Sequence, residues 1–195
     1  MANLKGSRTE INVVTAFAGE SQARNRYTFA ASIAKKAGYV KIAQVLEETA
    51  DQEKEHAKRL FKFLDNPQEV QITASYPAFG LSGDIAAHLA HAAAGEHHEW
   101  TEMYPGFAKV AREEGFGELA AVMENIAVAE KYHEARFNEY LQEIKNGSYF
   151  KSDGPTVWRC LNCGYIHQGQ EPPKACPACA HPVDYFEALF NVVKP

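Results

Sequence analysis

Between residues 116 and 146, hydrophobic positions recur every three or four residues, which predicts one amphipathic helix with a continuous buried face. The hydrophobic members of this face are Leu119, Met123, Ile126, Phe137, Tyr140 and Ile144. Glu130 and His133 belong to the same series, so the helix directs a carboxylate and an imidazole into the core. A buried charge is costly unless it is paired or binds a metal. The three-residue spacing also places both groups one turn apart on one face.

Residues 39–64 repeat this pattern and predict a second helix. Glu53 and His56 lie there in a seam of hydrophobic residues, again three positions apart. The next segment, residues 65–82, contains proline and glycine and has no helical period. Such a long connection is typical of a bundle in which the chain crosses from one end to the other.

Two more helices are predicted, at residues 9–37 and at about residues 83–114. Each has a single acid, Glu20 or Glu96, in an otherwise apolar stripe. We expect Pro105 to kink the later helix, because proline removes one backbone hydrogen bond. The pattern therefore predicts four helices, each with an acid on its inner face.

The two halves of this helical region repeat each other. The tripeptide AGE occurs at residues 18–20 and 94–96, an offset of 76 positions. AKKAGY at residues 34–39 matches AREEGF at residues 111–116 with an offset of 77 positions. The two Glu-x-x-His motifs also differ by 77 positions. A one-residue insertion near Pro105 explains the change of offset.

The repeat predicts a dinuclear metal centre. Two helix pairs related by a pseudo-two-fold axis bring two lone glutamates and two Glu-x-x-His motifs to one level, as in ferritin-like dinuclear carboxylate proteins. The alternative is four solvated helices with incidental acids. One motif alone is a weak signal, but two in register on apolar faces favour the metal site. The ligands predicted from the repeat are Glu20, Glu53, His56, Glu96, Glu130 and His133.

The halves differ at one position in particular. Glu99 follows Glu96 by three residues, whereas the matching residue in the first half is Ala23. We interpret Glu99 as a fifth carboxylate ligand on one side of the centre; the alternative is an acid on the helix surface. Tyr27 and Tyr104 are candidates to donate hydrogen bonds to ligand carboxylates, and the alternative for both is an ordinary core aromatic.

After the helices, residues 148–155 are rich in Gly, Ser, Asp and Pro, which indicates a linker between a bundle at residues 1–147 and a small domain at residues 156–195. This last domain contains two Cys-x-x-Cys pairs separated by twelve residues. Its predicted ligands are Cys160, Cys163, Cys176 and Cys179. Four thiolates suit zinc or iron. Redox-active iron is preferred over a structural zinc ribbon because the neighbouring centre needs electrons.

The composition of the chain argues against some classes of binding partner. The formal net charge is −5, from 20 basic and 25 acidic residues, and setting aside five ligand glutamates leaves 20 of each sign. This balance argues against nucleic acid or an anionic membrane as a partner. Apolar runs are short, which predicts no membrane span. The N-terminus has no apolar stretch of the signal-peptide type, and the paired cysteines indicate metal rather than disulfides. We therefore expect a cytoplasmic protein.

These motifs, in this order, resemble the rubrerythrin family over the whole chain. The segments WRCLNCGY and CPACAHP of the tail resemble rubredoxin. The resemblance implies a mainly α fold, with a ferritin-like four-helix bundle and a C-terminal rubredoxin-like metal-binding β domain. It implies a di-iron centre held by the seven glutamates and histidines named above, in which Glu99 and His56 exchange on one iron as the redox state changes. It also implies one further iron held by the four cysteines.

The same resemblance implies an activity and partners. The expected reaction is the reduction of hydrogen peroxide to water in protection against oxidative stress. Electrons would come from NADH through a separate reductase or rubredoxin. The expected assembly is a homodimer or larger homo-oligomer, with the tail of one subunit near the bundle of its partner. The alternatives are an iron-storage ferroxidase and a protein with zinc in both sites.

Overall fold

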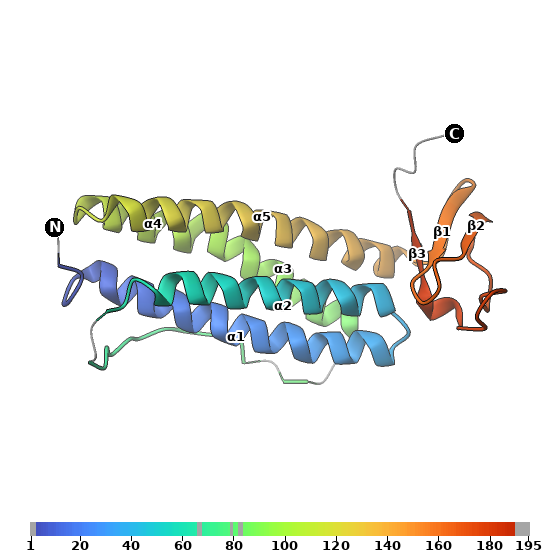
Figure 1. Cartoon of the computed structure of the whole chain (residues 1–195), viewed down its shortest axis with the longest axis horizontal. Helices are drawn as coiled ribbons and strands as arrows, with labels where there is room; N and C mark the ends of the chain where they lie inside the picture. Colours follow the sequence, from blue (N-terminus) through green and yellow to red (C-terminus); the bar gives the residue numbers. More distant parts are fainter. Residues whose placement is uncertain (1–2, 66–67, 79, 82–83, 190–195) are drawn as a thin grey trace.

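A computed structural model describes residues 3–65, 68–78, 80–81 and 84–189, and it shows a four-helix bundle followed by a small β domain (Figure 1). The first helix pair is α1 (Arg8–Lys36) and α2 (Val40–Phe61). In the second pair, the chain of α3 (Ile85–His98), η1 (Glu99–Met103) and α4 (Tyr104–Glu113) lies against α5 (Gly117–Asn146). The predicted mainly α class and the bundle are confirmed.

The helix ends follow from local chemistry. Ser7 caps α1, where its side chain accepts a hydrogen bond from the backbone N–H of Glu10, and Asp84 caps α3 in the same way through Ala87. Gly147 ends α5 in the left-handed conformation, with φ of 67°, which glycine adopts without steric cost. The predicted start of the third helix at Gly83 lies outside the described residues.

The sequence pattern predicts one α-helix over about residues 83–114, but the structure shows three consecutive helical segments in its described part. Of these, η1 is a π-helical segment between α3 and α4, and Pro105 follows it in the first turn of α4. A π-segment accommodates one extra residue inside a helix. The repeat offset grows from 76 to 77 between residues 96 and 111, so the inserted residue is absorbed by this π-segment.

The connection between α2 and α3 crosses the length of the bundle, as predicted, and runs beside α1 (Figure 1). In its described part, the hydroxyl of Tyr76 donates a hydrogen bond to the backbone carbonyl of Thr15 in α1, at 3.3 Å. Because of this crossover, the two helix pairs enter the bundle from opposite ends. This places the two repeated motifs at the same level.

The bundle core consists of two hydrophobic clusters. One contains Tyr27, Leu46, Leu89 and Phe137, and the other contains Leu60, Tyr104, Leu119 and Met123. The buried glutamates belong to neither cluster. The hydrophobic residues therefore fix the helices on both sides of a polar layer, and this layer is the candidate site.

The C-terminal domain is a three-stranded antiparallel sheet with order β2-β1-β3. Its strands are β1 (Thr156–Cys160), β2 (Ile166–Gly169) and β3 (Phe186–Ala188), with a short 3-10 helix, η2 (Val183–Tyr185), before β3. Trp158 and Phe186 are fully buried beside Cys160 and Cys176. Such a small core shields the cysteines but needs the bound metal for its stability.

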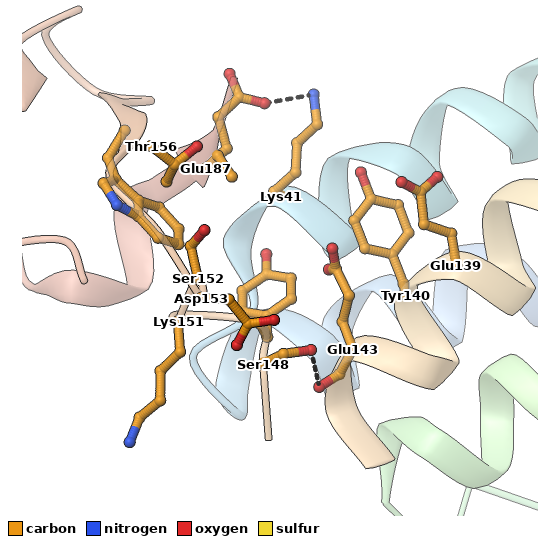
Figure 2. A pocket seen from close by; sticks show the side chains of 13 residues that line it. Lys41, Glu139, Tyr140, Glu143, Ser148, Lys151, Ser152, Asp153, Thr156 and Glu187 are labelled. Atoms are coloured by element: carbon orange, nitrogen blue, oxygen red, sulfur yellow. Dashed lines mark hydrogen bonds and ion pairs between the residues drawn. The ribbon is translucent and has the colours of Figure 1, made fainter. Parts of the chain in front are cut away.

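The β domain packs on the end of the bundle formed by the start of α2 and the end of α5 (Figure 1). The ammonium of Lys41 in α2 lies 3.0 Å from the carboxylate of Glu187 in β3 (Figure 2). Arg159 in β1 pairs with the same carboxylate. Glu143 of α5 faces this junction, where burial and the charge of Glu139 raise its pKa to about 7. Among the described helices, none is long and apolar enough to cross a membrane.

Candidate metal centre

Glutamate and histidine side chains from all four helical segments meet between the two hydrophobic clusters. They form two groups, and within each group the ligand atoms lie within 4.8 Å of one another. The first group is Glu20, Glu53, His56 and Glu130, and the second is Glu53, Glu96, Glu130 and His133. Because Glu53 and Glu130 belong to both groups, the geometry fits two neighbouring metal ions that share two carboxylates. Each ion then has one glutamate and one histidine of its own.

The donor atoms of this cluster are buried without adequate hydrogen bonds. Glu96 and Glu130 are fully buried, and Glu20 and Glu53 are each 1% exposed. Among the described residues, the buried atoms that lack a hydrogen-bond partner include Oε2 of Glu20, Oε1 of Glu53, Oε2 of Glu96, both carboxylate oxygens of Glu130 and Nδ1 of His133. Orphaned buried polar atoms are costly, and carboxylate oxygens with imidazole nitrogens are ligands of iron. The residues present therefore fit a dinuclear iron centre.

The electrostatics of the cluster lead to the same conclusion. Burial and the charge of Glu53 raise the pKa of Glu96 to about 8. Burial alone would raise the pKa of Glu53 too, but the neighbouring imidazoles of His133 and His56 lower it to about 2. Despite its own burial, His133 has a pKa raised to about 12 by the carboxylates of Glu130, Glu53 and Glu96. Without a metal, protons and imidazolium groups balance this excess of negative charge; two divalent cations would balance it directly.

Two buried tyrosines bond to the outer carboxylates in a crossed pattern. The hydroxyl of Tyr27 donates to Oε1 of Glu96, and the hydroxyl of Tyr104 donates to Oε1 of Glu20. Tyr27 and Tyr104 differ by 77 positions, so they are equivalent residues of the repeat. Each half therefore supplies the hydrogen-bond donor for the other half's glutamate, which fixes both carboxylates and ties the helix pairs together.

Gln52 is a functional candidate that the sequence pattern did not reveal. Its amide oxygen accepts a hydrogen bond from Nε2 of His133, at 2.9 Å, which leaves Nδ1 directed at the carboxylates. A metal-binding histidine commonly needs such an acceptor for its second nitrogen. The sequence alone indicates that His133 needs an acceptor for its second nitrogen. Only the alignment of α2 against α5 identifies Gln52 as that acceptor.

Glu99 occupies a different place from the other predicted ligands. It is the first residue of the π-segment, and it does not belong to either group of converging ligand atoms. Burial and the charges of Glu20, Glu96, Glu130 and Glu53 raise its pKa well above the usual value. Its side chain also lines an open cavity beside the cluster. Glu99 is thus near enough to interact with the cluster, and its role as a ligand remains a prediction.

The four cysteines form the second candidate centre. Sγ of Cys160 lies 3.7 Å from Sγ of Cys179, and Sγ of Cys163 lies 3.6 Å from Sγ of Cys176. A tetrahedral ion with metal–sulfur bonds of about 2.3 Å requires sulfur–sulfur separations of roughly 3.8 Å. All four sulfurs lie within 4.8 Å of one another, so the site fits one such ion.

Two matching turns build this cysteine site. The backbone N–H of Gly164 donates to the carbonyl of Cys160, and the N–H of Ala180 donates to the carbonyl of Cys176, both at 2.8 Å. Gly164 and Ala180 both have positive φ, of 78° and 60°. A backbone hydrogen bond from His181 lowers the pKa of Cys179 to about 6. Such backbone donors favour the thiolate form that binds metal.

Together, the buried glutamate–histidine cluster and the four-cysteine site define a ferritin-like di-iron carboxylate protein with a rubredoxin-like domain. Comparison with known proteins identifies the particular family. The Rubrerythrin family model matches residues 12–141, and the model described as "Rubrerythrin, rubredoxin-like domain" matches residues 158–187. The chain therefore belongs to the rubrerythrin family.

Individual relatives are similar over nearly the whole chain. A rubrerythrin of Nitratidesulfovibrio vulgaris is 57% identical over 189 residues, which cover 97% of this chain and 98% of the relative. A rubrerythrin of Porphyromonas gingivalis is 54% identical and covers 96% of this chain and 92% of its own length. Among solved structures, nigerythrin in a mixed-valence state matches with a TM-score of 0.61 and 32% identity, over 94% of this chain and 87% of that one.

Proposed function

We propose that this protein is a peroxidase that reduces hydrogen peroxide to water in protection against oxidative stress. The observation that carries the proposal is the pair of converging ligand groups that share Glu53 and Glu130, joined in one chain to a four-cysteine site. A pair of ferrous ions bound there would supply both electrons needed to cleave the O–O bond of peroxide. An electron-transfer site in the same chain would return those electrons.

The protein's own residues hold this centre in place. We propose that Glu53 and Glu130, which belong to both ligand groups, would hold two metals together with Glu20 and His56 on one side and Glu96 and His133 on the other. Tyr27 and Tyr104 hold the outer carboxylates by hydrogen bonds. Glu99 stands beside the pair as an additional carboxylate for the Glu20 side. Its exchange with His56 would couple the redox state to the ligand set.

We propose that the four cysteines would hold an iron able to pass on single electrons, supplied by an NADH-dependent reductase or a rubredoxin. The β domain packs at the start of α2, near Lys41, and Glu53 lies twelve residues further along that helix. At 1.5 Å per residue, this separates the junction from the cluster by about 18 Å within one chain. The length of α2 supports a homodimer or larger assembly in which one subunit's tail lies near its partner's bundle.

The proposal also covers location and two rival functions. We propose a cytoplasmic protein, in line with the paired thiols and the absence of any membrane-spanning helix among the described residues. An iron-storage function would need a shell and would not need the β domain. Zinc in both sites would make the protein colourless and redox-inactive, whereas iron–thiolate absorption would give a red protein.

The test combines metal analysis with a peroxide assay. Protein produced with ample iron should contain three irons per chain and should oxidise NADH in the presence of peroxide and a reductase. Cys160→Ala should lose the iron–thiolate absorption and slow this coupled turnover. After chemical reduction, rapid mixing of the same variant with peroxide should still oxidise the bundle irons. Loss of that direct reaction in Cys160→Ala, or fewer than two bundle irons in the native chain, would contradict the proposal.

A further inference from the structure

A cavity of about 720 Å³ lies beside the candidate metal centre, between α1, the crossover connection and the α3–η1–α4 chain. We call it the side cavity. Glu99 is one of its lining residues, so the cavity reaches the residue that stands next to the metal ligands. Its far wall is the crossover segment at residues 73–77, which Tyr76 ties to Thr15 of α1.

The side cavity is much larger than hydrogen peroxide requires. A water molecule occupies about 30 Å³ in the liquid, so peroxide with two oxygens needs roughly twice that volume. Cavities of roughly 300–1,000 Å³ are typical of sites for organic molecules of several carbon atoms. Met103, Phe107 and Pro77 give this cavity hydrophobic surface. Its size and lining therefore suit an organic molecule that presents one reactive end to the metal centre.

Two glycines keep this volume open. Gly19 and Gly95 are equivalent positions of the repeat, each directly before a ligand glutamate, and both line the side cavity. A Cβ atom on Gly19 would meet nothing within 4 Å, and one on Gly95 would meet only the end of the Arg26 side chain, at 3.8 Å. Neither has positive φ. Glycine inside a helix costs about 0.5–1 kcal/mol of stability relative to alanine. Neither the backbone conformation nor crowding therefore explains why glycine rather than alanine stands at these two positions.

We propose that the side cavity binds organic hydroperoxides and that this protein reduces them to alcohols. The inference rests on the proposed peroxidase function and extends its substrate class. In the reaction ROOH + 2e⁻ + 2H⁺ → ROH + H₂O, the O–O bond breaks and the hydroperoxide is reduced. The two electrons would be supplied by reduced iron held in the two ligand groups, and the two protons would come from solvent. The organic group R occupies the side cavity, with the O–O bond directed past Glu99.

Cumene hydroperoxide and its alcohol, 2-phenyl-2-propanol, are suitable probes. The wild-type protein should reduce both cumene hydroperoxide and hydrogen peroxide. Gly19→Leu fills the cavity from α1, and leucine is a better helix former than glycine. This variant should lower the ratio of kcat/KM for cumene hydroperoxide to that for hydrogen peroxide about tenfold. Gly106→Leu, which enters the same cavity from α4 where a Cβ is also unobstructed, gives a second test if Gly19→Leu does not fold.

Gly117→Leu is the matched control. Gly117 has the same open space for a Cβ but does not line the side cavity, so both rates should stay unchanged. Binding is measured separately, on zinc-loaded protein that has no redox activity. There, 2-phenyl-2-propanol should shift the backbone NMR signals of residues that line the cavity, and Gly19→Leu should abolish those shifts.

Three results would overturn the inference. In the first, the wild-type protein reduces hydrogen peroxide but neither reduces cumene hydroperoxide nor binds the alcohol. In the second, the ratio of the two rates is the same in Gly19→Leu and Gly106→Leu as in the wild type. In the third, the alcohol binds but the iron-loaded protein reduces neither peroxide, which contradicts the proposed function itself and the substrate assignment with it.

Discussion

The two halves of the bundle supply equivalent metal ligands but differ in the residues that surround these ligands. Each half supplies one lone glutamate, one Glu-x-x-His motif and one tyrosine to the buried centre. The second half alone adds Glu99, at the start of a π-segment. The first half alone adds Gln52, which bonds to the histidine of the second half. The position that matches Gln52 in the second half is Ala129, whose methyl group cannot accept a hydrogen bond.

We propose that this difference makes the His133 side of the centre fixed and the His56 side adaptable. His133 is anchored by Gln52, and its side chain is 3% exposed. His56 has Ala129 where the anchor would be, and its side chain is 18% exposed. The additional carboxylate of Glu99 stands on the His56 side in our proposal. We propose that the repeat builds two metal positions and that the few unmatched residues allow only one of them to change its ligands.

The largest effect is expected at the shared ligands. Glu53→Ala removes a carboxylate that belongs to both ligand groups, so it should lose both bundle irons. Glu20→Ala removes a carboxylate of one group and should keep about one iron. Glu55→Ala, an exposed residue of the same helix that pairs with Lys58, is the control and should keep two. The iron content of all three variants is measured by elemental analysis. Equal iron content in Glu53→Ala and Glu20→Ala would rule out a bridging role for Glu53.

Glu99 should affect turnover more than metal content. Glu99→Ala leaves both ligand groups complete, so the variant should retain both bundle irons but lose most of its peroxidase rate. Ala23→Glu tests the same idea from the other half, because it places an acid at the equivalent position. Iron content and steady-state rates are measured for both variants. Loss of iron in Glu99→Ala would make it an ordinary ligand, and an unchanged rate would make it a surface acid.

Removal of the hydrogen bond between Gln52 and His133 should weaken metal binding at only one of the two positions. Gln52→Leu leaves Nε2 of His133 without its acceptor, and loss of such a partner typically lowers metal affinity 10- to 100-fold. The effect should appear as one weakened site out of two in a competition titration with a chelator. Gln44→Leu, on the exposed face of the same helix, serves as control. If Gln52→Leu weakens both sites equally, the anchor does not distinguish the halves.

The smallest effect is expected for the tyrosines, where the halves match. Tyr27→Phe and Tyr104→Phe each remove one buried hydrogen bond to a carboxyl group and keep most of the side-chain volume. Each should lower the free energy of unfolding of the metal-free protein by about 1–2 kcal/mol. Chemical denaturation of the two variants provides the comparison. Clearly unequal losses would show that the crossed pair is not symmetric in energy.

Much of this architecture follows from the sequence by itself. Apolar periodicity indicates four helices, and the acids inside that periodicity identify which residues face the core. The repeat then predicts that the two motifs reach one level, and the paired cysteine spacing predicts a four-sulfur site. These inferences succeed because they depend on residue types at short, regular separations, which local geometry converts directly into a shared face or a turn.

Only the tertiary structure decides the rest. The sequence predicts one continuous helix over about residues 83–114, whereas the π-segment at Glu99–Met103 interrupts it and absorbs the extra residue. The crossed bonds of Tyr27 and Tyr104, the contact between Gln52 and His133 and the open space at Gly19 all depend on how separate helices are aligned. That alignment is set by the packing of both hydrophobic clusters at once. No local pattern in the sequence contains it, because each contact joins residues from distant parts of the chain.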